Sequence, residues 1–205
     1  MFCILLAAYP LSRTSKQFPK RSIFMWILVF CMLFNGGTVP WYITMKGYGL
    51  VDSIWGLVLG MGLNAYNLIL AVNFFKNLPA ELEEAALVDG AEPWKCLVLI
   101  FIPLAKPVIA TIALFTIVQY WNEFFRGMVL SARQSNYPLQ TYIQQLVVTY
   151  DFSTMNVEQT AQVQKLNKQS LDAAKIVVAM IPVLAVYPFL QKYFVSGITL
   201  GSIKG

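Results

Sequence analysis

The chain contains no histidine among its 205 residues. Histidine is the commonest general base near neutral pH and the commonest metal ligand, so its absence argues against most hydrolytic and metal-dependent enzymes. The three cysteines, Cys3, Cys31 and Cys96, stand far apart and lack the spacing of a metal site. A GxxxxGK[ST] phosphate-binding loop is also missing, so the chain does not bind ATP in that way. We therefore expect no catalytic residue, no metal site and no cofactor in this chain.

Charged residues are scarce as well. They make up 12% of the chain, whereas 58% of its residues are hydrophobic and the mean hydropathy is +0.60. Soluble domains carry about a quarter charged residues, so this composition predicts an integral membrane protein, and apolar runs of span length predict an all-α one. The net charge of +5 is compatible with nucleic-acid binding, but the basic residues lie beside apolar runs, where they orient a protein in a membrane. We expect a lipid bilayer, and no nucleic acid, as a partner.

Four apolar runs have the length of a membrane span, which needs about 20 residues. They cover residues 22–43, 54–75, 105–125 and 173–190. Gly36 and Gly37 interrupt the first run, and such an interruption is tolerated only where protein or a cavity satisfies the freed backbone groups. The expected fold therefore has four full spans plus a partial N-terminal span, in one transmembrane domain over residues 1–205.

The partial span consists of residues 1–11, which are apolar but too short to cross a bilayer. Basic residues follow this run instead of preceding it, which argues against a signal peptide. A half-span needs protein around it, so we expect either a longer subunit or a partner helix that shields these residues. Residues 12–22, 76–106 and 191–205 together hold nine of the fifteen basic residues, which places them on the cytoplasmic side.

Residues 77–104, which we call the coupling knob, begin too acidic to lie in lipid. Pro79 suits the first position of a helix, and Glu81, Glu83 and Glu84 follow where carboxylates oppose the helix dipole. Gly90 favours a left-handed helix stop, and Pro93 favours the start of a second helix. This pattern predicts a helix, a sharp corner and a second helix, a shape that fits a groove on another protein.

The coupling knob also resembles a known family. Glu84, Ala85, Ala86, Gly90, Ile100 and Pro103 stand at the spacing of the EAA signature of membrane subunits of binding-protein-dependent ABC importers. The family has Leu where this chain has Ile102, and Asp89 beside Gly90 fits the form of sugar-importing members. The resemblance implies the type I permease fold of ABC importers, with these six residues and Asp89 coupling it to an ATPase. For the glutamates alone, the alternative is a solvated acidic connector helix.

Further segments carry the resemblance: AAYPLSR is similar to the end of the family's second span, and WNEF to a motif of its sugar-importing permeases. GGTVP, and YPFLQKYFVSG followed by GSIKG, resemble one oligosaccharide-importing branch. On this interpretation the family's first span and half of its second are missing, because the subunit is either naturally short or truncated at its start. The resemblance implies three protein partners: a second permease of like fold, an ABC ATPase dimer and an extracytoplasmic solute-binding protein. It also implies a multi-pass location in the bacterial cytoplasmic membrane. The chain itself is then no enzyme, because ATP hydrolysis resides on a partner.

Polar side chains near the spans are candidates for the solute path. Trp121, Asn122 and Glu123 lie at the end of the third span, and Asn67 lies at membrane depth in the second. Aromatic rings that stack on sugars and amides that bond to hydroxyl groups are typical of a carbohydrate site. The alternatives are an interhelical hydrogen bond for Asn67, an interfacial position for Trp121 and an ion pair with Arg126 for Glu123.

The longest polar stretch, residues 131–172, is expected to form an extracytoplasmic loop. Within it, Pro138 favours the start of a helix at the outer surface that either roofs the pathway or contacts a partner; its apolar face comprises Leu139, Tyr142, Ile143, Leu146 and Val147. The expected function is the permease subunit of an ATP-driven importer for oligosaccharides or related carbohydrates. The rivals are an ion-coupled secondary transporter, a membrane enzyme and a truncated, non-transporting assembly subunit.

Overall fold

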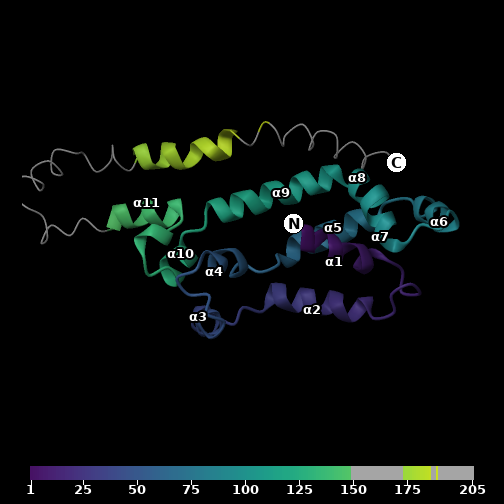
Figure 1. The fold of residues 1–205 in the computed structure, drawn as a ribbon, viewed down its shortest axis with the longest axis horizontal. Coiled ribbons are helices and arrows are strands. Elements are labelled where there is room, and N and C mark those ends of the chain that lie inside the picture. Colours follow the sequence, from purple (N-terminus) through teal and green to yellow (C-terminus); the bar gives the residue numbers. More distant parts are fainter. Residues whose placement is uncertain (149–172, 186–187, 189–205) are drawn as a thin grey trace, which may run out of the picture. The chain divides into compact units, whose positions relative to one another are not determined.

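A computed structural model describes residues 1–148, 173–185 and 188, except for the side chains of residues 146–148. This part of the chain is helical and contains no β-strand (Figure 1). Its helices are α1 (Phe2–Ser12), α2 (Arg21–Leu33), α3 (Thr38–Gly47), α4 (Ile54–Leu59), α5 (Ala65–Lys76), α6 (Ala80–Val88), α7 (Pro93–Cys96), the π-helix η1 (Leu97–Phe101), α8 (Ile102–Leu104), α9 (Lys106–Trp121), α10 (Phe125–Leu130), the 3-10 helix η2 (Gln134–Asn136), α11 (Leu139–Val148) and an unlabelled helix Ala173–Ala185.

No single helix in the described ranges is both long and apolar enough to cross a bilayer. Two consecutive pairs meet that requirement only when each pair is taken together across a bend: Arg21–Leu33 with Thr38–Gly47, and Pro93–Leu104 with Lys106–Trp121. The predicted run 22–43 is divided between α2 and α3, and the predicted run 54–75 is divided between α4 and α5, so neither is a continuous helix. Gly37 in the first break and Gly62 in the second have φ angles of 88° and 62°, which glycine adopts without steric cost.

The chain divides into two compact units. The first comprises Met1–Gly37 and Met61–Ile117, and the second comprises Thr38–Gly60 and the described residues of Val118–Phe189.

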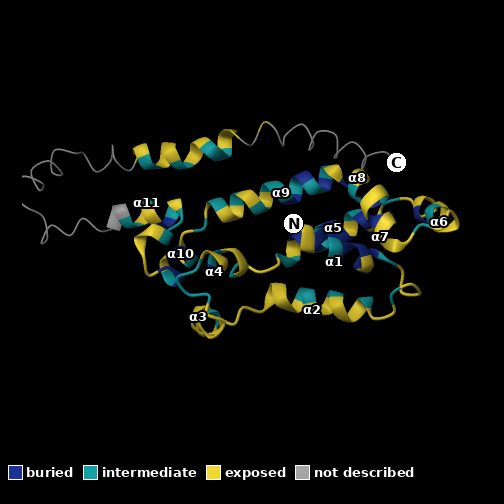
Figure 2. Ribbon diagram, viewed as in Figure 1, coloured by how far each residue is buried: buried dark blue, intermediate teal, exposed yellow. Residues whose placement is uncertain are grey.

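In the first unit, α1 packs along α5, and α2 contacts both helices. Figure 2 shows the buried residues gathered on α1 and α5, whereas α2 has no buried residue. Ala8 of α1 and Ala71 of α5 have no exposed surface, and small residues of this kind let two helix backbones approach closely. One face of the predicted half-span is therefore part of the core of this unit, whereas Phe2, Cys3 and Pro10 are exposed.

In the second unit, α10 packs against both α4 and α11. The closest approach is at Gly127 of α10, where a Cβ atom would stand 2.0 Å from the Thr141 hydroxyl and 2.7 Å from Cδ of Pro138. Thr141 is buried and donates a hydrogen bond to the Phe124 carbonyl at 2.8 Å.

The predicted helix after Pro138 exists as α11, and its apolar face is largely open in its described side chains. Leu139 and Tyr142 are 42% and 47% exposed, and the buried position between them is Thr141. Gly127 has no side chain, and this makes room for the Thr141 hydroxyl. The rest of the predicted loop, residues 149–172, lies outside the described residues.

Candidate functional site

The coupling knob has the predicted shape of a helix, a corner and a second helix. Helix α6 begins directly after Pro79, which caps it instead of occupying its first turn, and α7 begins at Pro93. Gly90 forms the corner with φ of 77°. Its N–H donates to the Leu87 carbonyl at 3.1 Å, and the N–H of Ala91 donates to the Ala86 carbonyl at 2.8 Å. These two bonds form a Schellman motif, in which a left-handed residue lets the chain turn back and satisfy the last helix carbonyls.

Beyond α7 the helix widens into the π-helical turn η1 and ends in α8. Pro103 has no N–H, so the Leu99 carbonyl loses its usual α-helical donor. The N–H of Ile102 donates to the carbonyl of Leu97, five residues earlier, which is the hydrogen bond of a π-helix. The axis then turns by 79° between Pro93–Leu104 and α9, close to where the prolines predicted a bend. Of the two signature residues here, Pro103 is exposed, and Ile100 is half-buried against the core of the first unit.

All but one of the remaining signature residues lie on the outside of the coupling knob. Glu84, Ala85 and Asp89 are exposed, as is the corner residue Gly90. Ala86 is half-buried and packs inward against the hydrophobic core. The exposed group thus joins two carboxylates to a methyl-sized side chain that permits close approach of a partner.

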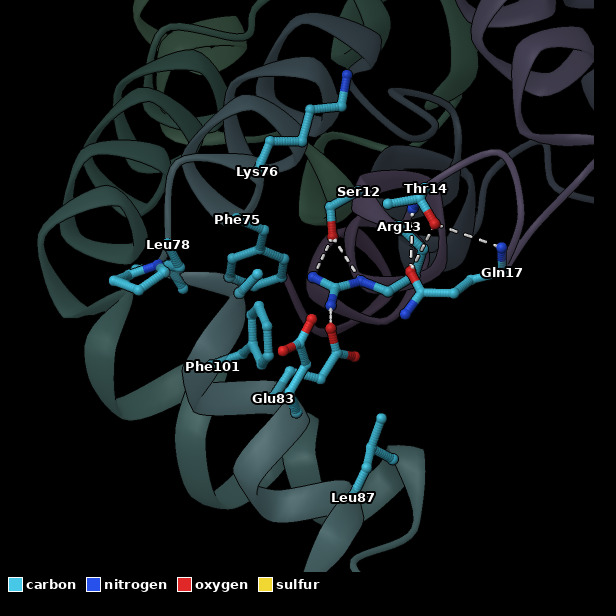
Figure 3. Close-up of a pocket in the computed structure, with 13 residues that line it drawn as sticks. Ser12, Arg13, Thr14, Gln17, Phe75, Lys76, Leu78, Glu83, Leu87 and Phe101 are labelled. Atoms are coloured by element: carbon cyan, nitrogen blue, oxygen red, sulfur yellow. Dashed lines mark hydrogen bonds and ion pairs between the residues drawn. The ribbon is translucent and has the colours of Figure 1, made fainter.

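Glu83 is a residue whose role the sequence did not reveal. It precedes Glu84 directly, yet it is only 8% exposed and faces α1. Its Oε1 accepts a hydrogen bond from the Tyr9 hydroxyl at 2.8 Å, and its Oε2 forms an ion pair with Nη1 of Arg13 (Figure 3). The available signal was the spacing of four residues between Tyr9 and Arg13, which places both on one face of a helix.

The Arg13 guanidinium is held on several sides. Its Nη2 donates to the Ser12 hydroxyl at 2.9 Å, and its central carbon lies 4.7 Å and 4.5 Å from the ring centroids of Tyr9 and Phe101. Burial lowers the pKa of Arg13 from its usual value, an effect that nearby Tyr9 partly offsets. Arginine nevertheless stays charged at any physiological pH, so Glu83 always faces a cation.

A small cavity of about 150 Å³ opens beside this ion pair, between the end of α1, the end of α5 and α6. Glu84 and Leu87 contribute to its wall, as Figure 3 shows for Leu87. Lys76 also lines the cavity, but its side chain extends away from Arg13. Burial, and secondarily the charge of Arg21, lowers the pKa of Lys76.

Three of the four solute-path candidates are close together in the second unit. Trp121 donates its indole N–H to the Ala179 carbonyl at 2.8 Å. Glu123 accepts the N–H of Arg126 at 2.8 Å and forms an ion pair with its side chain, which is the alternative considered for this carboxylate. Asn122 and Gln140 supply the polar groups of an open cavity of about 310 Å³, whose apolar wall comes from the helix Ala173–Ala185.

The fourth candidate, Asn67, belongs to the first unit. It is 1% exposed, and its amide group donates a long hydrogen bond of 3.5 Å to the Thr116 hydroxyl of α9. Thr116 in turn donates to the Ile112 carbonyl at 2.7 Å. These contacts match the interhelical hydrogen bond that was the alternative to a solute-lining position.

Comparison with known proteins gives consistent matches along most of the chain. A family model described as "Binding-protein-dependent transport system inner membrane component" matches residues 6–200. The chain is 41% identical to Protein LplC of Bacillus subtilis, over all of this chain and 68% of that protein. It is 40% identical to the polygalacturonan/rhamnogalacturonan transport system permease protein YtcP of the same organism, over all of this chain and 71% of the relative.

A solved structure is similar as well. It is the crystal structure of a bacterial ABC transporter involved in the import of the acidic polysaccharide alginate. One of its chains matches with a TM-score of 0.83 and 37% sequence identity, over 94% of this chain and 68% of that one.

Proposed function

Because the chain belongs to the family of binding-protein-dependent transport system inner membrane components, we propose that it is a permease subunit of an ATP-driven importer of oligosaccharides. It forms the solute pathway together with a second permease of like fold. An ABC ATPase dimer binds on the cytoplasmic side, and an extracytoplasmic binding protein delivers the solute. The chain resides in the cytoplasmic membrane and catalyses no covalent chemistry.

The observation that carries the coupling role is the geometry of the coupling knob. A Schellman corner at Gly90 holds α6 and α7 in a compact turn, and Glu84, Ala85 and Asp89 stand exposed beside it. Ile100 and Pro103 lie in the segment that joins this turn to α9. ATP binding closes the ATPase dimer and draws the knob with it, so the helices move between two arrangements that ligands bias.

The proposed solute is an oligosaccharide, and an acidic one is favoured. One relative is named for polygalacturonan and rhamnogalacturonan transport, and the similar solved structure for import of the acidic polysaccharide alginate. Trp121 and Asn122 are the proposed contacts, because Glu123 is paired with Arg126 and Asn67 of the first unit is 1% exposed and bonded to Thr116. The open cavity beside Asn122 combines amide groups with apolar side chains, as a carbohydrate surface requires.

The test is uptake in membrane vesicles that contain the complete importer. Oligogalacturonides and alginate oligosaccharides should accumulate when ATP is supplied, and maltotriose should accumulate less. Ionophores that collapse ion gradients should leave the uptake unchanged. Uptake that follows an ion gradient instead of ATP would overturn the proposal in favour of a secondary transporter.

The coupling role has its own test in the variant Glu84→Lys. Reversing an exposed charge at the proposed contact should lower the amount of ATPase that co-purifies with the subunit by about tenfold. The control is Gln134→Lys, which introduces the same lysine side chain at an exposed position of η2 in the other unit, with a charge change of +1 there against +2 at Glu84. Equal recovery of the ATPase with both variants would show that Glu84 lies outside the contact.

A further inference from the structure

Helix α6 has few backbone contacts with the other described helices, and more with its neighbour α7 than with any other. Its attachment to the rest of the first unit therefore depends on a small number of side chains. The buried Glu83 is the charged one among them, and both of its oxygens are bonded to residues of α1 and its C-terminal end.

We propose that Glu83, Arg13 and Tyr9 form a joint that transmits the movement of α6 to α1, and that Arg13 and Glu83 act as positioning residues for coupling. This inference rests on the proposed function, because it concerns how the motion of the coupling knob reaches the membrane helices. It assigns opposite tasks to neighbouring residues: Glu84 faces the partner, and Glu83 faces the chain's own interior.

The joint is rigid because its ion pair is shielded and fixed from both ends. The side chains of Arg13 and Glu83 are 13% and 10% exposed. Removing one member of such a pair leaves the other charge buried without a partner, which is strongly unfavourable, so the pair tends to move as a unit. The Ser12 hydroxyl and the rings of Tyr9 and Phe101 additionally hold the guanidinium plane in place.

The joint also has a continuous connection to the core. The Tyr9 ring packs edge to face on Phe101 of η1 at 5.1 Å, and Phe101 packs in the same way on Phe75 of α5 at 5.4 Å. Ala8, next to Tyr9, is buried in the core that α1 and α5 share. A displacement of α6 therefore reaches α1 through a polar contact and η1 through an aromatic one.

The test uses purified importer in proteoliposomes with all partners present. The measured quantity is the amount of solute transported per ATP hydrolysed, with oligogalacturonides and alginate oligosaccharides as the solute probe. Arg13→Gln and Glu83→Gln should each lower this ratio about fivefold or more, the lower range of measured coupling effects. Lys16→Gln is the matched control, because it removes a positive charge from an exposed residue of the same loop and should leave the ratio unchanged.

Two further variants separate transmission from simple stability. The exchange of charges in Arg13→Glu with Glu83→Arg should restore part of the ratio, because it rebuilds the pair in reverse. Tyr9→Phe removes only the hydroxyl and keeps the ring on Phe101, so its ratio should fall less than that of Glu83→Gln. If these variants only reduce the amount of assembled importer and the ratio per complex equals that of the unaltered protein, the joint has no role in coupling.

The proposed function can fail separately. An unaltered importer that shows no ATP-dependent uptake would contradict the function itself. An unaltered importer that couples normally, beside an Arg13→Gln variant that couples equally well, would contradict the joint alone.

Discussion

Gly90 forms the corner of the coupling knob, and its replacement should loosen α6. The residue has φ of 77°, a left-handed conformation that glycine adopts freely and residues with a Cβ atom adopt at a cost of about 1–2 kcal/mol. A Cβ atom added there would meet no heavy atom within 4 Å. The expected penalty of Gly90→Ala is therefore purely one of backbone conformation, with no contribution from a clash.

This penalty predicts a specific order among variants. Gly90→Asn should be milder than Gly90→Ala, because asparagine tolerates the left-handed region better than alanine does. Gly47→Ala is the control: Gly47 ends α3, a Cβ atom there would also meet open space, and its φ is not positive. A side chain at Gly90 should impair assembly more than a change at Glu84, because it alters the shape of the whole coupling knob.

Amide hydrogen exchange of residues 80–88 in the purified complex measures the effect directly. A cost of about 1–2 kcal/mol corresponds to opening of α6 that is about 5- to 30-fold more frequent. If Gly90→Ala exchanges at the rate of the unaltered protein, the left-handed corner does not hold α6. If Gly90→Asn is as disruptive as Gly90→Ala, the reasoning from backbone conformation is wrong.

The sequence predicted the shape of the coupling knob because the residues that determine it act on their own backbone. Proline at 79 and 93 restricts φ where a helix begins, and glycine at 90 permits the left-handed turn where one ends. None of these effects depends on a distant partner. Pattern and structure therefore agree to within one residue, the difference being the role of Pro79 as a cap.

The role of Glu83 could not be predicted in this way. Glu83 and Glu84 are chemically identical neighbours, and local rules assign both to the first turns of a helix. Only the packing of α1 against α5 brings Arg13, 70 residues earlier in the sequence, beside one of the two carboxylates. A single sequence, without the covariation that related sequences show, does not indicate which distant residues are in contact.

The apolar runs likewise gave the positions of the helices but not their continuity. Hydropathy reports how much apolar surface a window carries, and it does not report where the backbone turns. Gly36 and Gly37 predicted the break in the first run. The break after Leu59 was not predicted, and it contains Gly62 in a left-handed conformation. Similarly, the indole N–H of Trp121 donates a hydrogen bond to the carbonyl of Ala179, far along the chain, and no local pattern predicts this bond.

Three further predictions concern the second unit. Asp52 has a lowered pKa, chiefly because the Asn136 side chain donates a hydrogen bond to it. Its charged form thus stabilises the fold above the unfolded pKa of about 4, and this contribution is lost as the pH falls through the lower folded pKa. The thermal midpoint of the Asp52→Asn variant should therefore change less between pH 6 and pH 3 than that of the unaltered protein. Gly127→Ala should lower the stability by about 1–3 kcal/mol in thermal unfolding, because its Cβ atom would stand 2.0 Å from the hydroxyl of Thr141. For Trp121, the comparison of Ala and Phe variants decides between two roles. If the ring lies in the solute path, Trp121→Ala should abolish most uptake, Trp121→Phe should retain part of it, and both subunits should assemble normally. If the indole N–H instead anchors the helix Ala173–Ala185 through the Ala179 carbonyl, Phe loses that bond as completely as Ala does. Both variants would then accumulate poorly in the membrane, and the solute-path prediction for Trp121 would be wrong.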